Sequence, residues 1–240
     1  MRLAVHLNPV AQMRRLGGGD VPDPLGAALA ADLAGADGIA CRLNLSREPI
    51  SDRDIANLKE AIRSHLNVEV ELQEDLLRTA IDLAPDQVTL VPPEGAEPEE
   101  GLDVVGYSHE IKDAVAMFHA AEIEVSLLVA PDISQIKEAR RLESDYITLN
   151  TTAFAAARSP RDAVIHLEEI ESGALGAHRL GMRVLVARGL DHRSLAPLAG
   201  FDTIEEAILD HRLYARALFV GLERALAEVR ETVRWQTPRR

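Results

Sequence analysis

The fold of this chain is decided by residues 67–72, which read Asn-Val-Glu-Val-Glu-Leu. Polar and apolar residues alternate here, a pattern typical of a β-strand whose two faces meet different surroundings. A helical segment, Glu74–Leu83, and a second β-rich run, Gln87–Pro92, follow directly. This order of strand, helix and strand predicts two parallel strands joined by a right-handed crossover.

The same unit recurs along the chain. Eight β-rich runs are predicted at Leu3–Asn8, Gly38–Leu43, Asn67–Leu72, Gln87–Pro92, Glu124–Val129, Tyr146–Thr151, Met182–Arg188 and Ile204–His211. Helices are expected at Asp23–Ala36, Asp52–His65, Glu74–Leu83, Ser108–Ala121, Ile133–Leu142, Pro160–Leu180 and Arg193–Ala199, and a long last helix from Leu213 to about Val233. Eight such units in 240 residues predict a closed (β/α)8 barrel with extra helices, forming one domain over residues 1–240.

An open doubly wound sheet is the alternative that this alternation allows. Dinucleotide-binding sheets of that kind carry a glycine-rich turn directly after the first strand. Here Pro9 follows the strand, whereas Gly17, Gly18 and Gly19 come well downstream, where we expect a mobile loop. The closed barrel is therefore favoured.

Composition narrows the possible partners. Lys and Arg total 26 against 39 Asp and Glu, a net charge of -13, so we expect neither nucleic acid nor an anionic membrane surface as a partner. No apolar run approaches the length of a membrane-spanning helix. The single cysteine, Cys41, excludes an internal disulfide and fits a reducing compartment, so the cytoplasm is expected.

Functional side chains of such barrels gather at the carboxyl ends of the strands. Side chains alternate along a strand, so Glu69 and Glu71 face the same way, and the apolar residues between them place both inside the barrel. The candidates for catalysis are Glu69, Arg42 and Arg188, and those for substrate binding by position are His6, Asn8, Asn44, Glu71, Asn150, Thr151, Asp210, His211 and Arg212.

These residues allow two interpretations. Glu69 could be the centre of a structural ion-pair cluster with Arg42 and Arg188, since buried charges require partners. Alternatively, the two arginines could form a clamp for a small phosphorylated or carboxylated ligand, because guanidinium groups bind such anions in bidentate fashion. Either way, flanking arginines lower the pKa of Glu69 and weaken it as a base. No metal site is expected, because His6, Glu69, Glu71 and His211 lack ligand spacing.

Residues 92–101, which read Pro-Pro-Glu-Gly-Ala-Glu-Pro-Glu-Glu-Gly, form a long acidic connection after the fourth β-rich run. A loop of this length at the barrel mouth could be a lid. A solvated surface loop is the equally open alternative.

Several motifs in order along the chain resemble those of the pyridoxine 5'-phosphate synthases, which make the vitamin B6 skeleton from 1-deoxyxylulose 5-phosphate and 3-amino-2-oxopropyl phosphate. They are Asp23-Pro24, Ala34–Ile39, Ile50–Asp54, Asn67–Glu69, Leu90–Pro92, Gly101–Val104, Val125–Leu127 and Gly221-Leu222. The resemblance implies a (β/α)8 barrel with extra helices, association into homo-oligomers as large as octamers, and no metal or organic cofactor.

The resemblance also assigns the site residue by residue. Glu69 matches the family's glutamate, and Gly189 matches the second glycine of its Ala-Gly-His-Gly segment. Arg42 and Arg188 stand where the family has histidines, and Asp210 stands where it has a phosphate-binding glycine. Arginine stays protonated, so proton transfer through these two positions is expected to be lost.

Two hypotheses from different classes follow. In the first, the chain is a divergent family member that binds or converts a small phosphorylated or anionic metabolite. In the second, it is a catalytically silent paralogue that acts through its oligomer surface, as a scaffold or as the partner of an active relative. A new reaction in another pathway stays open as a third.

Overall fold

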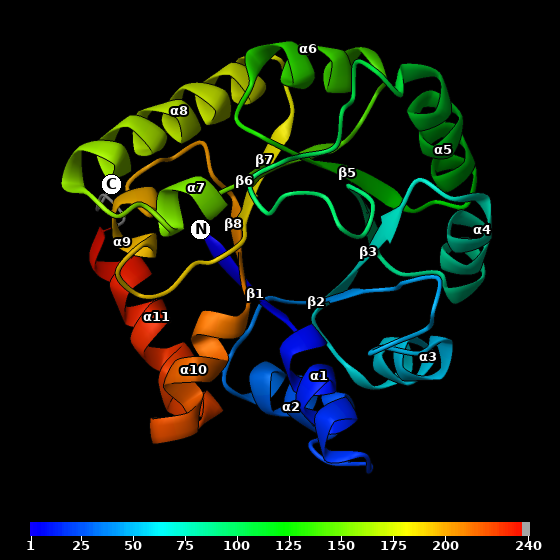
Figure 1. The fold of residues 1–240 in the computed structure, drawn as a ribbon, viewed down its shortest axis with the longest axis vertical. Helices are drawn as coiled ribbons and strands as arrows, with labels where there is room; N and C mark the ends of the chain where they lie inside the picture. The colour runs from blue at the N-terminus through cyan, green and yellow to red at the C-terminus, as the bar shows by residue number, and fades with distance from the viewer. Residues whose placement is uncertain (237–240) are drawn as a thin grey trace.

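The computed structural model describes residues 1–236 (Figure 1). Eight parallel strands pair in sequence order, and β8 pairs with β1 to close a barrel. The strands are β1 Arg2–His6, β2 Gly38–Arg42, β3 His65–Glu71, β4 Gln87–Val91, β5 Glu124–Val129, β6 Tyr146–Asn150, β7 Arg183–Ala187 and β8 Glu206–Leu209. The predicted (β/α)8 barrel is confirmed, and the open sheet is excluded.

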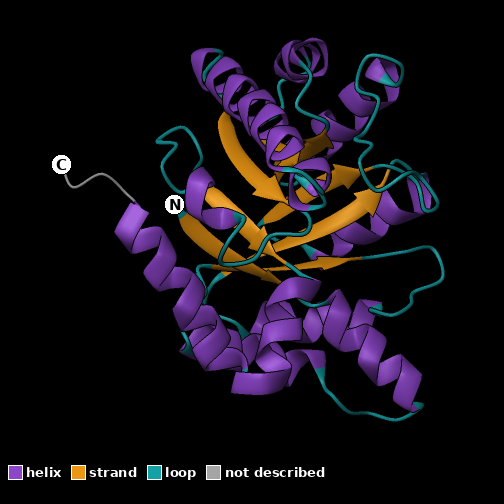
Figure 2. Cartoon of the chain, turned by 60° about the vertical axis from the view of Figure 1, so that its left-hand side comes forward, coloured by secondary structure: helices purple, strands orange, loops and turns teal. Residues whose placement is uncertain are grey.

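The helices surround this barrel, as Figure 2 shows. They are α1 Asn8–Gly17, α2 Pro24–Leu33, α3 Asp52–Ala61, α4 Glu74–Leu83, α5 Ser108–Ala120, α6 Ile133–Arg141, α7 Thr152–Ala155, α8 Pro160–Arg179, α9 Leu195–Leu198, α10 His211–Val220 and α11 Leu222–Gln236. Within residues 1–236, none of them is long and apolar enough to cross a membrane.

The barrel interior is more polar than the layer between strands and helices. Val68 and Val70 of β3 pack in the main apolar core with the helices, as does Cys41 of β2. Glu69 and Glu71 therefore face inward, as predicted, because side chains alternate along the strand. Hydroxyl and amide side chains fill the layer below them with hydrogen bonds: Thr89 Oγ1 to Asn67 Oδ1 at 2.9 Å, and Ser126 Oγ to Thr148 Oγ1 at 2.7 Å.

The region after the first strand was predicted wrongly. Helix α1 begins at Asn8, which was assigned to the strand, and Pro9 lies in its first turn, where a missing N–H costs nothing. Gly17 belongs to this helix rather than to a mobile loop. Gly18 ends it with φ 65°, a left-handed conformation that glycine adopts without a Cβ clash.

Three other boundaries also differ from the prediction. The expected long last helix is two helices, α10 and α11, separated at Gly221, whose φ is 85°. His65 is the first residue of β3 instead of the end of the preceding helix. Its Nε2 lies 3.2 Å from Oε1 of Glu206, at the amino-terminal end of the strands, opposite the mouth. The short helix α7 after β6 was not predicted.

Arg14 and Asp54 fasten α1 to α3. The Arg14 guanidinium donates to both Asp54 oxygens at 2.8 Å and to the carbonyl of Pro49. Asp54 also completes a capping box with Ser51. Burial raises the pKa of Asp54, but the hydrogen bonds from Arg14 and Ser51 outweigh it and lower the pKa to about 2.

We expect Asp54→Asn to lower the free energy of unfolding by about 2 kcal/mol, since it removes a helix cap and a charge-assisted pair. Because the folded-state pKa is depressed, the wild-type contribution is present above the ordinary value of 3.8 and is lost as the pH falls towards 2. Urea unfolding at neutral and acid pH measures both effects. Asp82→Asn, an exposed change on α4, is the control; an equal loss in this control would contradict the assignment.

Candidate functional site

Glu69 lies at the centre of the barrel mouth. Its side chain projects inward from β3, and the residue is only 1% exposed. Arg188, directly after β7, donates from Nη2 to Glu69 Oε2 at 2.7 Å, and Nε2 of His6 from β1 lies 3.3 Å from the same oxygen. The side chains of His6 and Arg188, from β1 and from the end of β7, thus meet at the Glu69 carboxylate on β3.

Glu69 and Arg188 stabilise each other in their charged forms. Burial raises the pKa of Glu69, but Arg188 and His6 outweigh it, so the pKa lies well below its usual range. Burial lowers the pKa of Arg188, but Glu69 and then Asp210 outweigh it and raise that pKa. Glu69 and Arg188 therefore remain ionised across the neutral range, and neither is suited to exchange a proton there.

Arg42 contacts a different carboxylate from the one predicted. Its Nη2 donates to Glu71 Oε1 at 2.8 Å and to the carbonyl of Pro92 at 3.0 Å, and its Nε donates to Asn44 Oδ1 at 3.1 Å. Asn8 Oδ1 accepts from the backbone N–H of Arg42 at 2.8 Å. The predicted network of both arginines around Glu69 is therefore two separate pairs, Arg188 with Glu69 and Arg42 with Glu71.

Arg188 is held in an unfavourable backbone conformation. Its φ is 92°, a region that costs a residue with a side chain about 1–3 kcal/mol. Thr151 stabilises it by donating from Oγ1 to the carbonyl of Arg188 at 2.6 Å and to that of Ala187 at 3.0 Å. Thr151 was predicted to bind substrate, but it is fully buried and these contacts fix the Arg188 backbone.

The segment after β8 places the negative charge of Asp210 at the mouth, where it pairs with a backbone amide. Asp210 Oδ2 accepts from the backbone N–H of Gly189 at 2.9 Å, so a carboxylate of the chain itself occupies this amide. His211 begins α10 with its side chain 66% exposed. Arg212 donates from Nη2 to the carbonyl of Ala155 at 2.8 Å, which ties α10 to α7.

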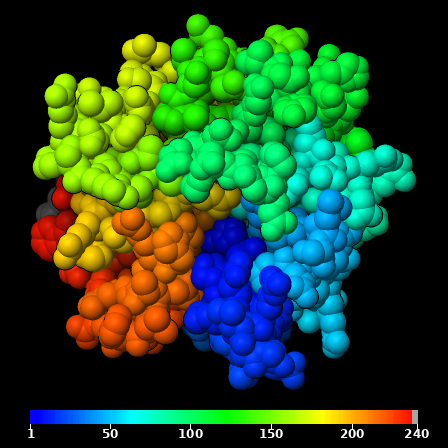
Figure 3. Space-filling view, viewed as in Figure 1, coloured from blue at the N-terminus to red at the C-terminus, as the bar shows by residue number. Residues whose placement is uncertain are grey.

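The acidic connection after β4 lies over the mouth. Figure 3 shows it spread across the middle of this face of the molecule, beside a hollow. Asn150 at the end of β6 donates from Nδ2 to the carbonyls of Pro98 and Glu100, both at 2.9 Å. At the other end of the connection, Glu94 N–H donates to Glu71 Oε1 at 2.9 Å. Asn150 and Glu71, predicted as substrate-binding residues, thus fasten this loop.

Asn150→Ala should release residues 93–101 with little change in melting temperature, because it removes both carbonyl contacts of a surface loop. We expect a glutamate-specific protease to cut the variant in this loop several-fold faster than the wild type. Thr152→Ala is the matched control, since within residues 1–236 the Thr152 hydroxyl hydrogen-bonds only to Asn150 Oδ1 and not to the loop. Equal cleavage of all three proteins would show that Asn150 does not hold the loop.

Within residues 1–236, no group of three or more His, Cys, Asp or Glu side chains is arranged to hold a metal ion. What the mouth offers is the Arg188 guanidinium, which within the same range donates only through Nη2 to the ionised Glu69 carboxylate. Such a site can bind an anion and fix its orientation.

The fold and the site define a class of protein: a (β/α)8 barrel with a charged, ion-paired mouth at the carboxyl ends of its strands. The family model of the pyridoxal phosphate biosynthesis protein PdxJ matches residues 3–235. This chain belongs to the PdxJ family.

Individual relatives agree with this assignment. A pyridoxine 5'-phosphate synthase of Geobacter sp. (strain M21) is 37% identical over 236 residues, which cover 98% of this chain and 99% of the relative. One of Synechococcus sp. (strain JA-2-3B'a(2-13)) is 36% identical over 97% of this chain and 98% of its own length.

Solved structures at low identity support the fold alone. KGPDC from Streptococcus mutans aligns with a TM-score of 0.67 at 11% identity, over 98% of this chain and 97% of its own. Phosphoribosyl anthranilate isomerase from Thermus thermophilus aligns with a TM-score of 0.60 at 17% identity, over 95% of this chain and 100% of its own.

Proposed function

We propose that this chain binds a small phosphorylated or otherwise anionic metabolite at the barrel mouth and does not carry out the condensation catalysed by pyridoxine 5'-phosphate synthases. The observation that carries the proposal is the Arg188 guanidinium, which lies inside the mouth and is 23% exposed. Among residues 1–236 it donates hydrogen bonds only through Nη2, to Glu69. Its Nε and Nη1 donors are therefore left for a ligand oxygen.

The electrostatics of the site argue against proton transfer. Glu69 and Arg188 hold each other in their ionised forms, and arginine does not exchange its proton near neutral pH. Arg42 is engaged by Glu71, Asn44 and Pro92, which leaves it to support the loop rather than to act on a substrate. A general acid–base residue contributes about 10²–10⁴-fold to a rate, so the loss of two such positions is severe.

The family context supports an anionic ligand. The relatives that match nearly the whole chain are named for a product that carries a 5'-phosphate. We propose in addition that the chain works in the cytoplasm as a homo-oligomer, as its resemblance to the family implies, with no metal or organic cofactor.

Isothermal titration calorimetry with inorganic phosphate and with pyridoxine 5'-phosphate tests the proposal. We expect at least one of them to bind the wild type, and Arg188→Gln to weaken binding at least about ten-fold, since hydrogen bonds to charged groups are worth about 1.5–3 kcal/mol. Arg188→Lys should retain part of the affinity because it keeps the charge without the planar fork. Arg161→Gln, an exposed change on α8, is the control. Equal binding by all variants would refute an Arg188 anion site.

One observation favours the second hypothesis, a catalytically silent paralogue acting as a scaffold or partner. The Asp210 carboxylate accepts the hydrogen bond of the Gly189 N–H, and the Glu71 carboxylate accepts one from Arg42. Side chains of the protein itself therefore pair with two of the donors at the mouth. If no phosphorylated compound binds, native mass spectrometry of this chain mixed with an active relative tests this function. Mixed oligomers would support the scaffold, and separate species would argue against it.

A further inference from the structure

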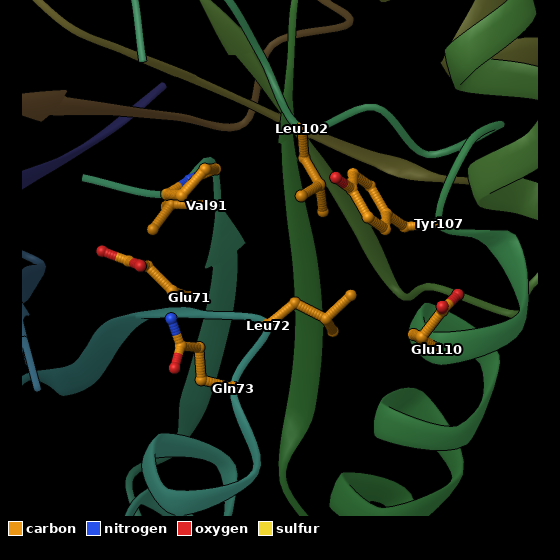
Figure 4. A pocket seen from close by; sticks show the side chains of 8 residues that line it. Glu71, Leu72, Gln73, Val91, Leu102, Tyr107 and Glu110 are labelled. Atoms are coloured by element: carbon orange, nitrogen blue, oxygen red, sulfur yellow. The ribbon is translucent and has the colours of Figure 1, made fainter. Parts of the chain in front are cut away.

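The two ends of the barrel differ in the partners of their buried carboxylates. At the mouth, Glu71 accepts from Arg42 and from the Glu94 N–H. Its side chain points away from the apolar cavity that Leu102 and Tyr107 help to line (Figure 4). Arginine keeps its charge throughout the neutral range. At the opposite end, a buried carboxylate is paired instead with a side chain that titrates.

This carboxylate belongs to Glu206 of β8, which is fully buried. Nε2 of His65 lies 3.2 Å from its Oε1. Its Oε2 lies 3.4 Å from Arg2 Nε, but among residues 1–236 this oxygen has no hydrogen-bond partner. A buried charge is costly unless it is paired and hydrogen-bonded. Glu206 therefore depends on the His65 imidazole for its hydrogen bond.

The contact between His65 and Glu206 spans the seam that closes the barrel. β8 pairs with β1 and β1 pairs with β2, so His65 on β3 reaches Glu206 past two strands. Gly38 of β2, the register partner of His65, makes this possible. A Cβ at position 38 would lie 2.3 Å from His65 Cε1, which is closer than packed atoms approach. The imidazole ring therefore occupies the space that a side chain on Gly38 would need.

The immediate surroundings of His65 favour its protonated form. Its side chain is 21% exposed, so solvent can exchange its proton. Burial lowers the pKa of His65, but the hydrogen bond and the charge of Glu206 outweigh it, so the pKa is raised.

Other charged residues at this end of the strands have smaller effects on His65. Arg2 of β1 lowers the pKa of His65, and the backbone of Asp37, directly before β2, raises it. Asp86, directly before β4, lies close enough for the His65 charge to lower the pKa of its carboxyl. Further round the barrel, the charged side chains of β5 and β7 pair with each other, Glu124 with Arg183.

We propose that His65 and Glu206 form a pH-sensitive clamp at the base of the barrel. With His65 protonated, its imidazolium donates to Glu206 and ties β3 to β8 across the seam. When His65 loses its proton, Glu206 stays buried without a charged hydrogen-bond donor, and the base opens more readily. Because the folded-state pKa is raised, the clamp is complete below the ordinary value of 6.5 and is lost as the pH rises through the folded-state pKa. The clamp is independent of the anion proposed for the mouth.

The titration of His65 in the full chain tests the pairing, followed by ¹H–¹³C NMR of the imidazole Cε1–H between about pH 5 and about pH 9. We expect a midpoint above 6.5 in the wild type and below 6.5 in Glu206→Gln, where burial and Arg2 act without the carboxylate. His109, an exposed residue on α5, is the internal reference and should titrate alike in both proteins. A wild-type midpoint at or below 6.5, or the same midpoint in both proteins, would overturn the clamp.

Urea unfolding tests the clamp without the Glu206→Gln variant. The urea midpoint of the wild type should fall as the pH rises from about 6 to about 8.5, because the proton on His65 is lost. His65→Gln can still donate a hydrogen bond but carries no titrating charge, so its midpoint should fall much less. His109→Gln is the matched control and should keep the wild-type pH dependence. The same pH dependence in the wild type and His65→Gln, or an equal change in His109→Gln, would overturn the proposal.

Discussion

Replacing Glu69 by Gln is expected to destabilise the protein by about 3–5 kcal/mol, the loss seen when one partner of a buried ion pair is removed. Arg188 would remain charged inside the mouth, without the carboxylate that its Nη2 now contacts at 2.7 Å. The unfavourable φ of Arg188 adds to the cost, because that conformation is stabilised only by its surroundings. Guanidinium chloride unfolding at neutral pH measures the change.

Two further variants identify the ion pair as the cause. The double variant Glu69→Gln with Arg188→Gln should recover much of the lost stability, since it leaves no unpaired charge. Glu71→Gln should cost less than Glu69→Gln, because Arg42 keeps its contacts with Asn44 and Pro92. Additive losses in the double variant would show that Glu69 and Arg188 are not coupled.

The second large effect concerns turnover. With 1-deoxyxylulose 5-phosphate and 3-amino-2-oxopropyl phosphate, we expect the wild-type chain to be slower than an active relative by at least about 10⁴-fold, since we propose that arginine stands at two positions where the family resemblance implies proton-transferring histidines. The Geobacter relative, 37% identical, assayed in parallel, is the reference. Product formation at a comparable rate would refute the proposed loss of the reaction.

Restoring the histidines alone should not restore the reaction. In Arg42→His with Arg188→His, Asp210 still occupies the Gly189 amide, which we propose an anionic group would otherwise use. Adding Asp210→Gly removes this carboxylate and is expected to give the larger gain in phosphate binding. Substantial turnover by the histidine double variant would show that proton transfer was the only function lost.

The recurrence of eight strand–helix units was enough to predict the parallel barrel, and the pattern of residues 67–72 predicted the inward direction of Glu69 and Glu71. It could not identify the partner of Arg42. Arg42 lies beside Glu69 in the strand register, yet its long side chain reaches Glu71, two residues further along the same face. Which carboxylate Arg42 contacts depends on the conformation of its side chain and on the carbonyl of Pro92. Only the folded loop brings this carbonyl close to Arg42.

Other differences have similar physical causes. Helix α1 was missed because its polar and basic residues show little beyond Pro9 to mark a start. The break at Gly221 was missed because the apolar residues before and after this glycine suggested one continuous helix, whereas its φ of 85° ends α10. Thr151 and Asn150 were placed correctly at the end of β6, but their partners are backbone carbonyls of distant segments.

Arg188 holds Glu69 in its ionised form, so we infer that Glu69 does not exchange protons in the neutral range. Carbon-13 NMR of the Glu69 side-chain carboxyl, followed as the pH is lowered from about 8 to about 4, tests it directly, because the ordinary glutamate pKa falls within this interval. We expect a constant chemical shift throughout, since the pKa of Glu69 lies well below its usual range. A titration with a midpoint at or above the ordinary value of 4.5 would contradict it.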